Sequence, residues 1–96
     1  KSLEKAGVFS VVIECTVYSL VDKLLKKSAV PLIGIGATSG CDGQILVAED
    51  LLGLTDFESK FLKKYVNLKE IISNAFKKFS DDVRKRRYPI KKNYYK

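Results

Sequence analysis

One stretch of the sequence decides the fold, and it reads VFSVVIECTVYSLVDKLLKKSAVPLIGIG (residues 8–36). Its first part, residues 8–13, is a β-branched apolar run that ends at Glu14, which is typical of a strand buried on both faces. Apolar residues then recur at the spacing of one helix face, at Val17, Leu20, Val21, Leu24 and Leu25. A second buried strand is expected at residues 32–36. Strand, helix and strand in this order predict a βαβ unit, whose two strands are parallel.

The segment that follows is less regular. Residues 40–43 (GCDG) indicate a turn, and the apolar segment 44–54 fits either a strand or a short helix. Thr55 and Glu58 have the spacing of a helix capping box, so we expect a helix to begin after Thr55.

A second capping box, Asn67 with Glu70, predicts a long helix in the last third of the chain. This helix has one continuous apolar stripe, formed by Leu68, Ile71, Ile72, Ala75, Phe76, Phe79 and Val83. The stripe needs a partner surface, and a two-stranded βαβ unit offers little. The packing therefore predicts the end of a larger α/β domain.

The composition excludes several classes of site. The 96 residues include no His, so a Ser-His-Asp triad, a Cys-His pair and a His-built metal site are all excluded. Cys15 and Cys41 lie 26 positions apart, which indicates cytosolic thiols rather than a disulfide framework or a zinc site. No apolar run is long enough to span a membrane, and no segment resembles a signal peptide. Because the chain opens on Lys1 rather than Met, we expect a processed chain or a piece of a longer one.

The net charge of +7 is unevenly distributed. Residues 1–56 have 5 basic and 7 acidic side chains, whereas residues 57–96 have 13 and 4. The basic residues of segment 84–96 are interleaved with tyrosines, which suits phosphate contact and base stacking. The alternative is a solvated tail that follows a helix.

Glu14 is the first candidate for chemistry, because α/β folds place catalytic groups at the carboxyl ends of their strands. Apolar walls would disfavour the charged form of its carboxylate, which could then act as a general base. The alternative is a solvated or ion-paired glutamate at a strand edge.

Gly34 and Gly36 are the second candidates, since glycines at a strand end let a ligand approach the backbone. Their spacing fits neither the dinucleotide fingerprint nor a P-loop. The alternative is tight packing inside a barrel.

Four segments taken together resemble the ketopantoate hydroxymethyltransferase family: VVIEC (residues 11–15), VPLIGIGA (30–37), CDGQILV (41–47) and DLLGL (50–54). The similarity continues to Tyr88 and Pro89, and it corresponds to the C-terminal third of the family. Thr38 stands where the family usually has Gly, and Glu49 where it often has His.

The resemblance implies an α/β fold that is the C-terminal portion of a (β/α)₈ TIM barrel, with its last two βα units and C-terminal helices. Such a barrel needs about 250 residues. Residues 1–88 would belong to this single domain, and residues 89–96 would form a basic tail. The family uses Mg²⁺ and 5,10-methylenetetrahydrofolate to convert 3-methyl-2-oxobutanoate to ketopantoate in the cytoplasm, on the route to coenzyme A. It forms homo-oligomers, and neither a membrane nor a nucleic acid is an expected partner.

The resemblance also assigns residues. Glu14 matches the proton acceptor of the family, and Gly34 and Gly36 fall on the rim of the substrate pocket. The Mg²⁺ ligands precede this chain, so none of Asp22, Asp42 and Asp50 should replace them and no metal ligand is expected here. We therefore expect the 96 residues to be inactive alone. The alternatives are a polyanion-binding module acting through residues 84–96 and a non-functional remnant.

Overall fold

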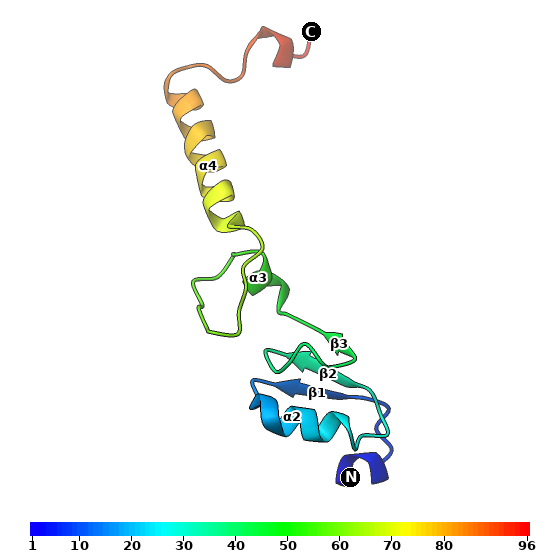
Figure 1. The fold of residues 1–96 in the computed structure, drawn as a ribbon. Coiled ribbons are helices and arrows are strands. Elements are labelled where there is room, and N and C mark those ends of the chain that lie inside the picture. The colour runs from blue at the N-terminus through cyan, green and yellow to red at the C-terminus, as the bar shows by residue number, and fades with distance from the viewer.

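The computed structural model describes all 96 residues, with a small sheet near the N-terminus and a long helix leading away from it (Figure 1). In chain order the elements are α1 (Ser2–Lys5), β1 (Val11–Glu14), α2 (Tyr18–Leu25), β2 (Leu32–Ile35), β3 (Gly43–Gln44), α3 (Ala48–Leu51), α4 (Leu68–Arg84) and the 3-10 turn η1 (Lys91–Asn93). The chain measures 68 × 30 × 18 Å, and its radius of gyration is 22.7 Å. A compact domain of this size has a radius of gyration of about 13 Å, so most of the surface that this fold needs to bury finds no cover within the chain.

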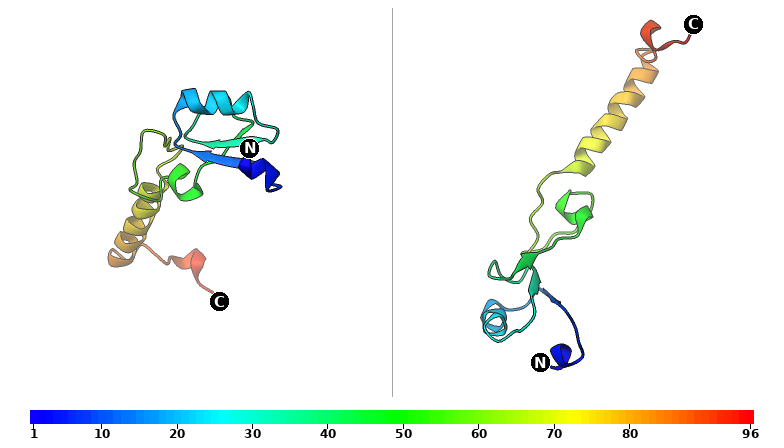
Figure 2. Two further views of the ribbon diagram at one scale, coloured as in Figure 1. Left: turned by 90° about the horizontal axis from the view of Figure 1, so that it is seen from below. Right: turned by 90° about the vertical axis from the view of Figure 1, so that its right-hand side faces the viewer.

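The sheet has the order β1-β2-β3, and both pairs of neighbouring strands are parallel. The register aligns Val11 with Leu32 and Glu14 with Ile35, so the carboxyl ends of β1 and β2 lie side by side. Helix α2 connects the two strands and lies along one face of the sheet (Figure 2). The predicted βαβ unit is therefore confirmed.

Strand β1 is shorter and more exposed than expected. It begins at Val11, whose N–H donates to the Pro31 carbonyl (3.0 Å), so residues 8–10 lie outside the ladder. Val11 and Ile13 are half-buried, whereas Val12 is 55% exposed and Glu14 is exposed as well. The prediction that this strand is buried on both faces is wrong for the chain alone, because α2 covers one face and no element covers the other.

The apolar core consists of Val21 from α2 together with Leu32 and Ile35 from β2. Val21 is fully buried, which fits its place on the predicted apolar face of the helix. Three buried side chains are few for a chain of this length, and small cores leave little net stability. The face of the sheet opposite α2 is therefore the surface on which further strands or helices would pack.

The segment 44–54, which fits either a strand or a short helix, contains both. Gly43 and Gln44 form β3 against β2, and α3 follows at Ala48–Leu51. Helix α3 ends on Gly53, whose φ of +70° lies in the left-handed region. Its closing bond runs from the Leu54 N–H to the Glu49 carbonyl (2.9 Å), the pattern of a Schellman cap.

The helix predicted after Thr55 does not form. The Thr55 hydroxyl donates instead to the carboxylate of Asp50 (Oγ1 to Oδ1, 2.6 Å), which ties it back to α3. Residues 55–67 then follow an irregular path, and the Tyr65 N–H returns to the Leu51 carbonyl (2.8 Å). The prediction was wrong because a tertiary contact uses the side chain that the capping box requires.

Helix α4 begins where the second capping box predicts. The Asn67 Oδ1 accepts from the Glu70 N–H (3.4 Å), and the Asn67 Nδ2 donates to the Glu70 carboxylate (2.9 Å). The apolar stripe has no cover within the chain, and Phe76 is 70% exposed. At the far end Phe79 meets Tyr88 edge-to-face, with ring centroids 5.7 Å apart. The helix itself is thus confirmed, and most of its stripe is left exposed by these residues.

Gly53 fixes the turn from which α4 departs, and its replacement should loosen this turn. A Cβ at Gly53 would overlap the Val66 carbonyl oxygen and lie 3.0 Å from Asn67 Cα. This overlap adds to the cost of placing a non-glycine residue in the left-handed region. We therefore expect Gly53→Ala to weaken the turn by about 2 kcal/mol. Hydrogen exchange should then be at least about tenfold faster at the Leu68 and Lys69 amides, which donate to the Leu52 and Gly53 carbonyls.

Gly7→Ala is the matched control. Gly7 also has a positive φ, +90°, but an added Cβ would meet no atom within 4 Å. It should leave exchange at Leu68 and Lys69 unchanged. Unchanged exchange in Gly53→Ala as well would contradict this account of the turn.

Candidate functional site

Glu14 ends β1, and the backbone around it is held in place on both sides. Its register partner is Ile35, and the next N–H, that of Cys15, donates to the Ile35 carbonyl (2.9 Å). Cys15 has a φ of +48°, which is uncommon for a residue other than glycine and is found most often at functional sites. The Thr16 hydroxyl then donates back to the Glu14 carbonyl (3.1 Å). The sharp turn fixes the point at which the Glu14 side chain leaves the sheet.

The Glu14 carboxylate is exposed in this chain and takes part in none of its ion pairs. It lines a hollow of about 450 Å³ along the free edge of β1, together with Val12, Thr16 and Leu24. Within these residues the apolar walls expected around the carboxylate are incomplete, because no strand covers this edge. A neighbouring strand at this edge would complete them.

Gly34 lies inside β2 and is buried. A Cβ there would come within 2.9 Å of the Gln44 side-chain oxygen and 3.0 Å of the Cys41 sulfur. The space beside Gly34 is therefore filled by the chain's own side chains, as the packing alternative predicts.

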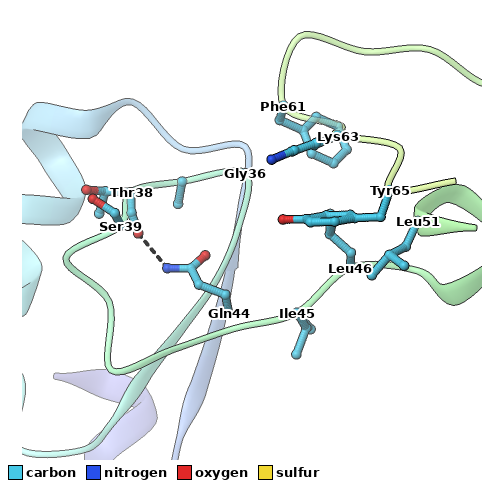
Figure 3. Close-up of a pocket in the computed structure, with 11 residues that line it drawn as sticks. Gly36, Thr38, Ser39, Gln44, Ile45, Leu46, Leu51, Phe61, Lys63 and Tyr65 are labelled. Atoms are coloured by element: carbon cyan, nitrogen blue, oxygen red, sulfur yellow. Dashed lines mark hydrogen bonds between the residues drawn. The ribbon is translucent and has the colours of Figure 1, made fainter.

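Gly36 follows directly after β2 and lines an open cleft of about 600 Å³ (Figure 3). Its φ is +64°, and an added Cβ would overlap the side chain of Phe61. Glycine is therefore required here for two reasons. The backbone is left-handed, and the aromatic side chain of Phe61 lies too close to leave room for a Cβ. Gly36 and Glu14 end neighbouring strands, but they line different hollows.

The cleft lies between the residues that follow β2 and the irregular segment 61–65. Gln44 is fixed across its floor, where its Nε2 donates to the Thr38 carbonyl (2.7 Å). On the opposite side Lys63 and Tyr65 project into the space (Figure 3), and the Lys63 Nζ lies 4.8 Å from the centroid of the Tyr65 ring. Sequence reasoning assigned no role to Phe61, Lys63 or Tyr65, since they belong to a segment without periodicity.

Asp22, Asp42 and Asp50, which are not expected to bind a metal ion, all make structural contacts. Asp22 pairs with Lys26 (3.0 Å). The Asp42 carboxylate accepts from the Leu32 N–H (2.8 Å), and Asp50 accepts from Thr55. No group of three or more Asp, Glu, Cys or His side chains is placed to hold a metal ion.

The basic segment 84–96 is partly neutralised near its start. Arg87 donates to Asp81 (Nη2 to Oδ2, 2.6 Å) and to Asp82 (Nε to Oδ1, 2.9 Å). These bonds tie Arg87 to the last turn of α4, while the residues beyond Pro89 are exposed. No helix of the chain combines the length and the apolar character that crossing a bilayer requires.

The Arg87 contact predicts a measurable titration. The hydrogen bond from Arg87, with a second from Lys85, holds the pKa of Asp81 below its ordinary value of 3.8. A lowered folded-state pKa means that this contact stabilises the tail above about pH 3.8 and is lost as the pH falls through the lower, folded value. A carbon-13 titration of the Asp81 carboxyl should have its midpoint below 3.8.

The substitution Arg87→Gln should raise that midpoint, since it removes the strongest donor. Arg86→Gln is the control, because Arg86 takes part in no ion pair and should leave the midpoint unchanged. A midpoint that does not respond to Arg87→Gln would contradict the assignment.

Comparison with known proteins shows which family this chain resembles. The family model described as ketopantoate hydroxymethyltransferase matches residues 1–91. A 3-methyl-2-oxobutanoate hydroxymethyltransferase from Pelagibacter ubique is 47% identical over 95 residues, which cover 99% of this chain and 37% of the relative. The protein of the same name from Saccharolobus islandicus is 51% identical over 92 residues, covering 96% and 34%, and that from Enterococcus faecalis is 49% identical over 90 residues, covering 93% and 33%.

The chain thus spans about a third of the length of the curated relatives that it matches. The matched residues run without a break from α1 through the βαβ unit and α4 into η1. They include the turn after Glu14, the cleft beside Gly36 and the exposed stripe of α4. With a family model matching nearly the whole chain and relatives near half identity, the chain belongs to the ketopantoate hydroxymethyltransferase family.

Proposed function

We propose that this chain is the C-terminal portion of a (β/α)₈ barrel that transfers a hydroxymethyl group from 5,10-methylenetetrahydrofolate to 3-methyl-2-oxobutanoate. The product is 2-dehydropantoate, or ketopantoate. In this proposal residues 1–88 supply the last two βα units and the C-terminal helices, and residues 89–96 form the tail. The proposal rests on the family match, on the names of the relatives and on one structural observation.

That observation is the position of Glu14. It ends a parallel strand beside the end of β2, and Val12 and Glu14 share the more exposed face of β1, alternating with the half-buried Val11 and Ile13. In a (β/α)₈ barrel the helices lie outside, so the face opposite α2 would be the interior. The carboxyl end of such a barrel is where catalytic residues gather. Glu14 therefore has the place that a catalytic carboxylate would have.

The chemistry needs a base at this point. The carbon next to the keto group of 3-methyl-2-oxobutanoate has one hydrogen, and Glu14 would remove it as a proton. The electron pair left behind forms the enolate. Water attacks the methylene carbon of the folate, both C–N bonds of that carbon break, and tetrahydrofolate leaves while the carbon is delivered as formaldehyde. The enolate carbon then forms the new carbon–carbon bond to this carbon, and the resulting alkoxide takes up a proton to give the hydroxyl group. A positioned general base contributes about 10²- to 10⁴-fold to a step of this kind.

The Mg²⁺ implied by the resemblance does not fit the residues of this chain. Asp42 and Asp50 already accept hydrogen bonds from Leu32 and Thr55, and no three ligand side chains converge. We propose that the metal ligands lie in the other two-thirds of the fold.

The remaining partners follow from the same proposal. The keto acid and the folate would bind at the strand ends, and the enzyme would work in the cytoplasm, where thiols such as Cys15 and Cys41 stay reduced. The exposed stripe of α4 would be covered in a homo-oligomer or by the rest of the barrel. The proposal includes no nucleic-acid partner, and two cations at the start of the basic segment, Lys85 and Arg87, are paired with Asp81.

A chimera tests the proposal. Residues 1–96 would replace the 95 matching residues of the Pelagibacter ubique relative, which then supplies the rest of the fold. The chimera should form ketopantoate from the two substrates, whereas the 96 residues alone should form none. Turnover by the isolated chain would contradict the claim that the other two-thirds are required.

A further inference from the structure

We propose that the cleft between Gly36 and Tyr65 binds the p-aminobenzoyl-glutamate part of the folate co-substrate, with Lys63 as the cation that holds its glutamate carboxylate. This inference rests on the proposed function and assigns a location to one of its two substrates.

The position of the cleft separates it from the base. Gly36, Thr38 and Ser39, at one wall, follow directly after β2, so the cleft opens at the same end of the sheet as Glu14. Glu14 itself is not among the residues that line it. The keto acid must lie against Glu14 to lose its proton. The cleft is therefore placed for the substrate whose reactive carbon must reach the keto acid while the rest of the molecule lies farther away.

The size of the cleft also favours the folate. Its volume is about 600 Å³, within the range of about 300 to 1,000 Å³ that small-molecule sites occupy. A small branched keto acid would leave most of that space empty. An aromatic ring joined to a glutamate would fill much more of it.

The lining matches an aromatic group that ends in an anion. Phe61 and Tyr65 supply aromatic surface, and Leu46 and Leu51 extend it. Lys63 is the only charged residue among the 11 that line the cleft, and it takes part in none of the ion pairs of the chain.

Lys63 is also held in a suitable place. Its Nζ lies 4.8 Å from the centre of the Tyr65 ring, and Figure 3 shows Lys63 and the Tyr65 hydroxyl both pointing toward the side of Thr38 and Ser39. A cation over an aromatic face keeps its N–H donors free for a carboxylate. The benzoyl ring could then lie beside Phe61 while its glutamate meets Lys63.

The test pairs a variant with a truncated ligand in the chimera. Tetrahydrofolate and the carboxamide of tetrahydropteroate differ by the glutamate, and the carboxamide keeps the benzoyl end uncharged; the binding of both can be measured by calorimetry without turnover. With Lys63 present, tetrahydrofolate should bind about tenfold more tightly, the scale of one charge-assisted hydrogen bond in a partly exposed site. In Lys63→Ala the two ligands should bind equally, and in Lys63→Arg the preference should return in part.

Lys60→Ala is the matched control, because Lys60 is exposed and does not line the cleft. It should keep the preference for the glutamate. In kinetics, Lys63→Ala should raise the KM for the folate about tenfold and leave both kcat and the KM for the keto acid unchanged.

Two outcomes would overturn the inference. One is a preference for the glutamate that survives in Lys63→Ala. The other is a loss of thermal stability in Lys63→Ala without any change in folate binding, which would mean that another part of the complete fold fills the cleft. In either case ketopantoate formation by the chimera would continue, so the proposed function would stand. Failure of the proposed function would appear instead as a folded chimera that binds tetrahydrofolate and makes no ketopantoate.

Discussion

Glu14→Gln in the chimera should lower kcat for ketopantoate formation by about 10²- to 10⁴-fold, the range that a positioned general base contributes. Glutamine has nearly the same shape as glutamate but cannot accept a proton at this step. The Glu14 carboxylate makes no hydrogen bond or ion pair within the chain, so its replacement leaves no partner unsatisfied. The loss should therefore appear in turnover rather than in folding.

Glu58→Gln provides the comparison. Glu58 is an exposed glutamate of the irregular segment and lines neither of the two hollows. It should keep full turnover, and both variants should unfold at the temperature of the parent chimera. A Glu14→Gln variant with undiminished kcat would remove Glu14 from the role of base.

Gly36→Ala should destabilise the chimera, because the added methyl group carries both a backbone cost and a packing cost. The left-handed backbone costs a non-glycine residue about 1–2 kcal/mol. The overlap of the new Cβ with Phe61 adds about 1–3 kcal/mol, the usual cost of overpacking. We therefore expect urea denaturation of the chimera to show a loss of about 2–5 kcal/mol.

A double-mutant cycle separates the two causes. Phe61→Gly removes both the Cβ and the ring that the new methyl group meets, so this second change should cost less in the Gly36→Ala background than in the parent. The left-handed cost should remain in the double variant. Strict additivity would show that Phe61 does not lie against Gly36 in solution.

Local rules predicted the elements whose partners are close in sequence. The βαβ unit follows from the change of period between residues 8–13 and the helix around Val21, and α4 follows from the Asn67 cap. The failures come from contacts that no local propensity encodes. Thr55 has a capping pattern, but its hydroxyl bonds to Asp50, so the expected helix is replaced by a loop. The exposure of Val12 could not be predicted either, because an apolar run does not tell which of its faces the rest of the chain covers.

The residues of the candidate site also form two groups, those that the sequence predicts and those that it does not. Glu14 and Gly36 could be found from the sequence because each ends a recognisable strand. Lys63 and Tyr65 could not, because they lie in an irregular segment whose path depends on the turn at Gly53 and on the bond from the Tyr65 N–H to the Leu51 carbonyl. The local cue, a pair of lysines followed by an aromatic residue, is common in solvated loops. Only the folded path of residues 55–67 turns it into one wall of a cleft.

The measurement that tests the central claim most directly is the rate of ketopantoate formation by the chimera that joins residues 1–96 to the remainder of the Pelagibacter ubique relative. If this chain is a working third of a ketopantoate hydroxymethyltransferase, kcat should lie within about tenfold of that of the relative, a difference of about 1.4 kcal/mol in the barrier. A chimera that folds, binds the keto acid and tetrahydrofolate, and forms no ketopantoate would contradict it.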